Sequence, residues 1–93
     1  MHAVVATVEI DTAHADKAQE MLHSTVVPDV KQIPGFVSGT WARSEDGTKG
    51  HSLVIFENED AAKAALAQAR QGPPPGAPVK MLYAEVYEVV AQA

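Results

Sequence analysis

The residues that could do chemistry lie in the middle of the chain and near its end. Trp41 is the only tryptophan, and its indole could stack on a flat aromatic substrate and donate one N–H group. Arg43 follows two residues later and could hold an enolate or a carboxylate. The neutral imidazole of His51 could serve as a base for a phenolic substrate. The hydroxyl of Tyr83 or Tyr87 could hydrogen-bond a substrate carbonyl.

Each of these residues also has an ordinary structural explanation. Trp41 could fill the core over small helix residues, although Gly39 beside it leaves room for a pocket. Arg43 could be a solvated hairpin residue, and His51 could be a polar residue at the rim of the sheet. Aromatic residues on a strand, such as Tyr83, usually contribute packing. The sequence leaves both interpretations open.

Several kinds of site are not expected. The chain has no cysteine, which excludes disulfides, thiolate metal sites and thiol catalysis. His14 and His23 are not spaced as a chelating i,i+4 pair, so we predict no metal site. The remaining carboxylates are explained by a turn and a helix start: Glu45, Asp46, Glu57, Glu59 and Asp60.

The length and composition predict one globular domain over residues 1–93, with 46% hydrophobic and 20% charged residues. A chain this short buries only about 60–65% of its unfolded surface, so a shared interface would add stability. The net charge is −5 and the Lys and Arg residues are scattered, which argues against nucleic acid and anionic membranes. Since no long apolar run and no basic N-terminal region occur, we expect a soluble, cytoplasmic protein.

The first half of the chain predicts a strand and then a helix. Residues 2–10 alternate with strand periodicity, and Asp11 and Thr12 can cap the helix that follows. Pro28 should break or kink this helix, because proline lacks an N–H group and crowds the previous turn. A short second helical segment over residues 28–32 accommodates it.

A hairpin is predicted next, with strands over residues 36–43 and 51–57 around a turn at Asp46 and Gly47. A symmetric turn places Trp41 opposite Ser52, Val37 opposite Phe56, and His51 opposite Ala42. Both faces of the hairpin are then largely apolar. One face holds Val37, Gly39, Trp41, Val54 and Phe56, and the other holds Phe36, Ser38, Thr40, Leu53 and Ile55.

The last third predicts a helix and a closing strand. Asn58 is a helix N-cap before an alanine-rich helix that stops at Gly72. A stiff, proline-rich connector leads to a strand over residues 79–90, on which Met81, Tyr83 and Tyr87 share one face. The order is β-α-β-β-α-β, an α+β fold with a single antiparallel sheet. Its two helices cover one face of the sheet, and the second apolar face predicts a homodimer.

Two stretches resemble the dimeric α/β-barrel superfamily and, within it, the antibiotic-biosynthesis-monooxygenase group. They are Val27-Pro28-Asp29-Val30-Lys31-Gln32-Ile33-Pro34-Gly35-Phe36-Val37 and Val54-Ile55-Phe56-Glu57-Asn58-Glu59-Asp60-Ala61-Ala62. The resemblance covers nearly the whole chain. It implies a ferredoxin-like protomer with a four-stranded sheet, two of which form a barrel, and a pocket between each sheet and its helices.

The resemblance also bears on activity. The haem-degrading branch keeps an Asn, a Trp and a His where this chain has Ala6, Phe56 and the 66–67 region, so haem degradation is not expected. The resemblance implies instead a cofactor-free monooxygenase acting on a small aromatic molecule, by deprotonation and electron transfer to O₂. Trp41, Phe56 and Tyr83 would hold the ring, and Arg43 or His51 would assist the charge. The alternative is a non-enzymatic binding or stress-related dimer whose pocket is filled by its own side chains.

Overall fold

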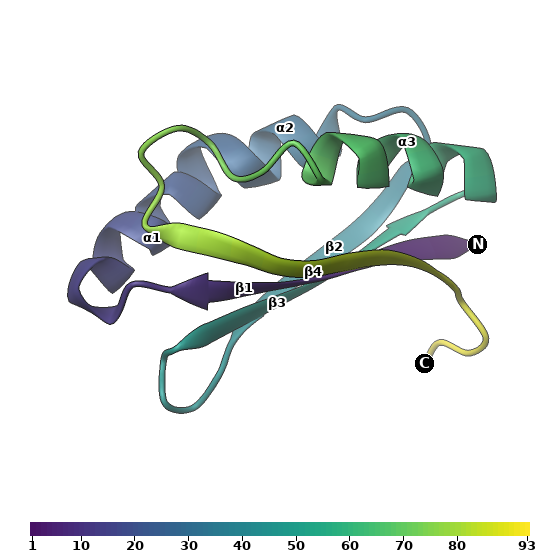
Figure 1. Ribbon diagram of the computed structural model, residues 1–93. Helices are drawn as coiled ribbons and strands as arrows, with labels where there is room; N and C mark the ends of the chain where they lie inside the picture. The colour runs from purple at the N-terminus through teal and green to yellow at the C-terminus, as the bar shows by residue number, and fades with distance from the viewer.

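The computed structural model describes residues 1–93 and contains one antiparallel sheet covered by helices on one side (Figure 1). The strands lie in the order β2-β3-β1-β4. They are β1 (His2–Ile10), β2 (Phe36–Arg43), β3 (Lys49–Phe56) and β4 (Val79–Glu88). The helical segments are η1 (Thr12–His14), α1 (Ala15–Met21), η2 (Leu22–Val26), α2 (Val27–Lys31) and α3 (Glu59–Ala69). The predicted βαββαβ order, the four-stranded sheet and the ferredoxin-like fold are therefore confirmed.

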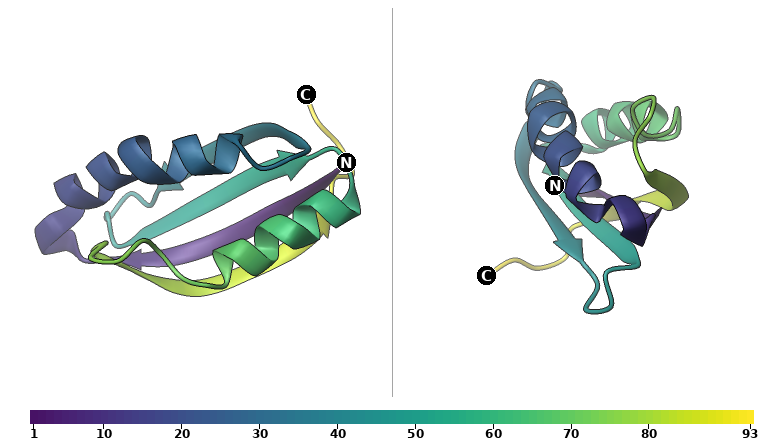
Figure 2. Two further views of the ribbon diagram at one scale, coloured as in Figure 1. Left: turned by 90° about the horizontal axis from the view of Figure 1, so that it is seen from above. Right: turned by 90° about the vertical axis from the view of Figure 1, so that its left-hand side faces the viewer.

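All the helices lie over the same face of the sheet, which we call the inner face. Seen from above, α1 to α2 and α3 run along two sides of the sheet, with β1 and β3 visible between them (Figure 2). The opposite, outer face carries no helix. No helix of the chain is both long enough and apolar enough to cross a membrane.

The first helix changes its geometry before Pro28, and the predicted second helical segment is present as α2, with no loop between the two. Asp11 caps the start of the first helix by accepting a hydrogen bond from the backbone N–H of Ala13 at 3.1 Å. Just before the proline the chain forms the π-helical turn η2, in which the N–H of Val27 donates to the carbonyl of Leu22. Pro28 then lies in the first turn of α2, where backbone N–H groups have no acceptor within that helix, so that the absence of an N–H group costs no hydrogen bond of α2.

The hairpin turn is tied together by one carboxylate. Asp46 accepts hydrogen bonds from the backbone N–H of Thr48 at 3.0 Å, from the Thr48 hydroxyl at 2.7 Å and from the Ser44 hydroxyl at 2.8 Å. These bonds, the backbone one first, lower the pKa of Asp46 to about 2. The structural explanation predicted for this residue is confirmed.

A β-bulge in β2 changes the predicted pairing of the hairpin. Trp41 lies opposite Ser52 and His51 opposite Ala42, as expected. Phe56, however, pairs with Phe36, because the register shifts between Phe36 and Ser38. Val37 is therefore the extra residue and is 44% exposed, and the prediction that it faces Phe56 is wrong. The rings of Phe36 and Phe56 meet edge to face, with centroids 6.3 Å apart.

A second bulge lies in β4 and separates two residues that were expected on one face. Thr7 pairs with Tyr83, whereas the next residue of β1, Val8, pairs with Met81. Leu82 is thus the extra residue. Met81 lies on the inner face with Val8, and Tyr83 lies on the outer face with Thr7.

The core lies at the end of the sheet where β3 finishes. Phe56 is only 1% exposed and packs with Val4, Val54, Ala62 and Ala65. As predicted, Asn58 is the N-cap of α3, and its side chain accepts a hydrogen bond from the N–H of Ala61 at 2.9 Å. Ala62 and Ala65 come from this helix, and their small side chains let α3 pack closely against the sheet at this end.

Candidate functional site

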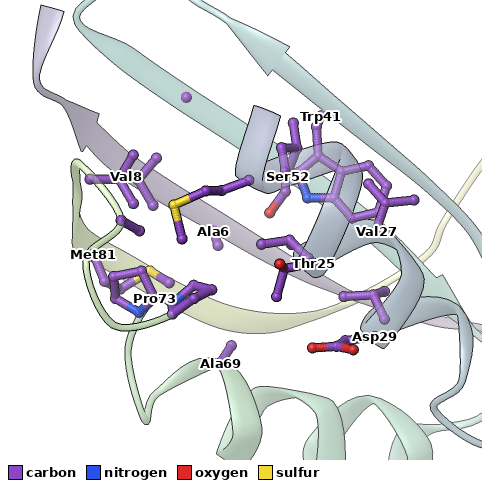
Figure 3. Close-up of a pocket in the computed structure, with 18 of the residues that line it drawn as sticks. Ala6, Val8, Thr25, Val27, Asp29, Trp41, Ser52, Ala69, Pro73 and Met81 are labelled. Atoms are coloured by element: carbon purple, nitrogen blue, oxygen red, sulfur yellow. The ribbon is translucent and has the colours of Figure 1, made fainter. Parts of the chain in front are cut away.

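A cavity of about 980 Å³ lies between the inner face of the sheet and the helices (Figure 3). It is at the upper end of the range that small-molecule sites occupy, roughly 300–1,000 Å³. The sheet contributes Ala6, Val8 and Ser52, the first helix contributes Thr25 and Val27, and α3 and the connector contribute residues such as Ala69 and Pro73. The pocket that the resemblance implied between sheet and helices is therefore present in the fold.

Most of the cavity wall is apolar, and the side chains that could have filled the space leave it open. Met21, Leu22 and Trp41 all line the cavity. The prolines at positions 73–75 border it as part of the connector between α3 and β4. An open apolar cavity with a few polar side chains is the usual form of a small-molecule binding site.

Trp41 lies on the inner face and its indole extends over Gly39. A Cβ atom placed on Gly39 would come within 2.7 Å of Cη2 and 2.8 Å of Cζ3 of that ring. Residue 39 must therefore be glycine for the indole to keep this position. The predicted juxtaposition of Gly39 and Trp41 on one face is confirmed, and the ring forms part of the cavity wall.

Gly39→Ala is expected to lower the free energy of unfolding by about 1–3 kcal/mol, because the added methyl group forces the indole out of its position. Chemical denaturation at one protein concentration measures the change. In a Trp41→Ala background the same substitution should cost little, since the ring that it displaces is absent. An equal loss in both backgrounds would show that the clash with the indole is not the cause.

Arg43 and His51 occupy different faces of the sheet. Arg43 follows Trp41 on the inner face, is exposed, and borders the cavity at the hairpin end. The His51 ring lies on the outer face, where its Nδ1 is 3.1 Å from Oγ1 of Thr7 in a hydrogen bond. His51 still borders the cavity, but this ring nitrogen is engaged by Thr7, and its assistance of charge in the cavity stays a prediction.

Tyr83 also lies outside the cavity, which corrects the prediction that it holds the ring together with Trp41 and Phe56. The bulge at Leu82 turns it to the outer face, where its hydroxyl donates to Oε2 of Glu85 at 2.8 Å and meets the hydroxyl of Tyr87. Both hydrogen bonds raise the pKa of Tyr83, and the one with Tyr87 is the larger cause. These two tyrosines form an outer-face pair with no access to the cavity.

Phe56 borders the cavity but belongs mainly to the core. It is 1% exposed, so it offers almost no surface to a ligand. Ala6 and Phe56, two of the positions matched to the haem-degrading branch, carry no iron-ligating atom, and Leu66 on α3 carries none either. No three His, Cys, Asp or Glu side chains lie together in a way that could hold a metal ion.

Several polar residues that line the cavity were not proposed from the sequence as site residues, among them Thr25, Asp29 and Ser52 (Figure 3). Thr25 and Asp29 are four residues apart and so fall on the same side of the helix. Their pattern was visible in the sequence, because Asp29 continues the helical stripe on which Thr25 lies. Ser52 pairs with Trp41 across the hairpin and shares its face.

Solved structures with the same fold include a monooxygenase, a protein assigned to the antibiotic biosynthesis monooxygenases and a haem degrader. The monooxygenase ActVA-Orf6 of Streptomyces coelicolor, solved with nanaomycin D, is 25% identical over 99% of this chain and 89% of its own, with a TM-score of 0.62. A Deinococcus radiodurans protein assigned to antibiotic biosynthesis monooxygenases is 14% identical over 100% and 96%, with a TM-score of 0.68. The haem degrader MhuD of Mycobacterium tuberculosis is 16% identical over 100% and 99%, with a TM-score of 0.69.

Sequence comparison alone does not reach this group, since no family model and no curated protein matches the chain. The structural similarity nevertheless extends over the whole chain. The chain has the ferredoxin-like fold of the antibiotic-biosynthesis-monooxygenase-like proteins, the group that the sequence resembles.

Proposed function

We propose that this protein is a cofactor-independent monooxygenase that binds a small aromatic molecule in the cavity between sheet and helices. The observation that carries the proposal is the cavity itself: it is large, mainly apolar, and has the indole of Trp41 in its wall. An indole is the side chain best suited to stack on a flat ring. The likeness to ActVA-Orf6, a monooxygenase solved with nanaomycin D, supports the same assignment.

The proposed reaction places most of the chemistry in the substrate. An electron-rich aromatic loses a proton to solvent to give an enolate, which passes one electron to O₂ and then combines with the superoxide formed. The peroxide anion takes a proton back from solvent, and the hydroperoxide loses water, so that a CH₂ group and O₂ become a C=O group and H₂O. The protein positions the substrate, excludes water and stabilises the developing negative charge. Arg43, which borders the cavity near the hairpin and is exposed, is the residue proposed to stabilise that charge.

We propose in addition that two copies pair through their outer faces to form a barrel. Large apolar side chains on this face remain exposed in the protomer, with Leu53 at 45%, Tyr83 at 37% and Tyr87 at 45%. The helices cover only the inner face, so the chain has no element of its own to bury these side chains. Face-to-face pairing removes them from water and leaves both cavities accessible. A cytoplasmic location stays a prediction from the sequence.

A second candidate is a binding protein without catalytic activity. The observation in its favour is that Ala6, Phe56 and Leu66 stand at positions where a related branch has functional groups. In this case the cavity would hold an aromatic ligand and release it unchanged. The two candidates share the binding step and differ in whether O₂ is consumed.

The test combines ligand binding with O₂ uptake, using anthrone as the substrate. Wild-type protein is expected to bind anthrone and to consume one O₂ per anthrone, because the CH₂ group is oxidised to a carbonyl. Trp41→Ala should weaken binding by about tenfold, the equivalent of one aromatic contact of roughly 1.5 kcal/mol. Trp41→Phe serves as the matched control, since it keeps a stacking ring.

Each outcome discriminates between the candidates. Binding with O₂ uptake above the rate of the protein-free solution supports the monooxygenase. Binding without uptake supports the non-catalytic protein. If the wild type neither binds anthrone or related tricyclic ketones nor consumes O₂ with them, both candidates are wrong.

A further inference from the structure

Asp29 is an exposed residue at the edge of the cavity, and its carboxylate has no partner within the chain. The ion pairs of the chain use Glu59 and Asp11, and the hydrogen bonds of Asp46 close the hairpin turn. Asp29 takes part in no ion pair and no side-chain hydrogen bond, although it is one of the residues that line the cavity. It is the only carboxylate among them.

The local structure holds Asp29 in this position. It lies in the first turn of α2, one turn after Thr25 on the same side of the helix, and both side chains border the cavity (Figure 3). Its neighbour Val30 packs against the core, which anchors α2 next to the sheet. The carboxylate and the indole of Trp41 are both among the side chains that line the cavity (Figure 3).

The cavity has a positive group as well, but at its other end. Arg43 pairs with Gly50 near the hairpin, at the end of the sheet where β1 finishes and the first helix begins. Arg43 forms no ion pair with Asp29. The charge of the Asp29 carboxylate is therefore not neutralised within the chain.

We propose that Asp29 is a specificity-determining residue that accepts a hydrogen bond from a donor group on the aromatic ligand. This inference rests on the proposed binding of an aromatic molecule in the cavity. A ligand ring stacked on Trp41 would bring a substituent within reach of the α2 end of the cavity. There a carboxylate, with acceptor oxygens only, favours a hydroxyl or ammonium group and disfavours an ether or a second carboxylate.

A structural explanation of Asp29 must be separated from this one. An acidic residue in the first turn of a helix interacts favourably with the helix dipole and so stabilises the helix. Asp29 occupies such a position in α2. Asp16 likewise lies in the first turn of its helix, α1, and does not line the cavity. It is therefore a matched control for any effect on the helix alone.

The test compares probes that differ in one group, using titration calorimetry on wild type, Asp29→Leu and Asp16→Leu. The probes are 2-naphthol, 2-methoxynaphthalene and 2-naphthylmethylammonium. Wild type is expected to bind 2-naphthol about tenfold more tightly than 2-methoxynaphthalene, the equivalent of one hydrogen bond to a charged group. Asp29→Leu should abolish this preference, and Asp16→Leu should keep it.

The ammonium probe shows which kind of donor the site favours. If it binds more tightly than 2-naphthol and loses its advantage in Asp29→Leu, the carboxylate selects donors and prefers a cation. If Asp29→Leu still binds 2-naphthol more tightly than 2-methoxynaphthalene to the same degree as wild type, the role of Asp29 is wrong. Binding of the aromatic probes in that case would leave the proposed aromatic site intact. If no probe binds to the wild type, the aromatic site itself is wrong and the role of Asp29 falls with it.

Discussion

Leu53→Asp is expected to convert the proposed homodimer into a monomer at micromolar concentration. Leu53 lies on the outer face, 45% exposed in the protomer, at the centre of the surface through which we propose that two copies pair. In a two-fold interface the substitution is present twice. Each unpaired carboxylate taken out of water costs several kcal/mol, so the dissociation constant should rise by at least about 100-fold.

Sedimentation velocity over a range of concentrations measures this change. Ala67→Asp is the matched control, because it adds the same charge to an exposed position of α3, on the other side of the molecule. It should leave the dimer intact. A wild type that sediments as a monomer, or a Leu53→Asp variant that remains a dimer, would contradict pairing through the outer face.

Phe56→Ala should lower the free energy of unfolding by about 3–5 kcal/mol, the range for removing a buried aromatic ring. Phe56 is the largest fully buried side chain and is 1% exposed. It contacts Phe36 edge to face and lies against the two buried alanines of α3. Since small domains are stable by only about 5–15 kcal/mol, this loss is a large part of the total.

Urea denaturation at a single protein concentration measures the loss, because unfolding of a dimer depends on concentration. Phe56→Leu is the control and should lose much less, since it keeps most of the apolar volume. If Phe56→Ala unfolds like wild type but fails to bind aromatic probes, Phe56 is a ligand-binding residue and not a core residue. This would restore the role first predicted for it.

The elements themselves could be predicted because their signals are local. The alternation of β1, the Asn58 cap of α3 and the Asp46-Gly47 turn depend on residues within a few positions of one another. The range of β2 was predicted to the residue. Trp41 and Ser52 were paired correctly, because both lie within four residues or so of the turn that sets the register.

The assignment of faces failed where the strands contain an extra residue. Val37 and Leu82 are each accommodated by a bulge, and every residue beyond a bulge changes its face relative to a regular strand. This moved Phe36 to the inner face and Tyr83 to the outer face. A bulge depends on which residue of a distant strand lies opposite, and periodicity along one strand contains no such information.

The site was predicted in part, and for a similar reason. Gly39, Trp41 and Arg43 could be identified because they alternate along one strand next to the turn. Asp29 was overlooked, although it lies on the helical stripe, because a first-turn acid has a sufficient local explanation. Only the folded chain shows that this carboxylate has no partner and lines a cavity.

By itself the sequence determined the α+β class, the order of the elements and the presence of apolar residues on both faces of the sheet, since these follow from local periodicity and from turn and cap residues. The tertiary structure decided where the bulges fall, that a π-helical turn carries the first helix through Pro28, and that this helix leaves a cavity above the sheet. These features depend on how strands and helices distant in the chain pack together. The candidate site depends on the same packing, because its residues come from β2, β3 and the first helix.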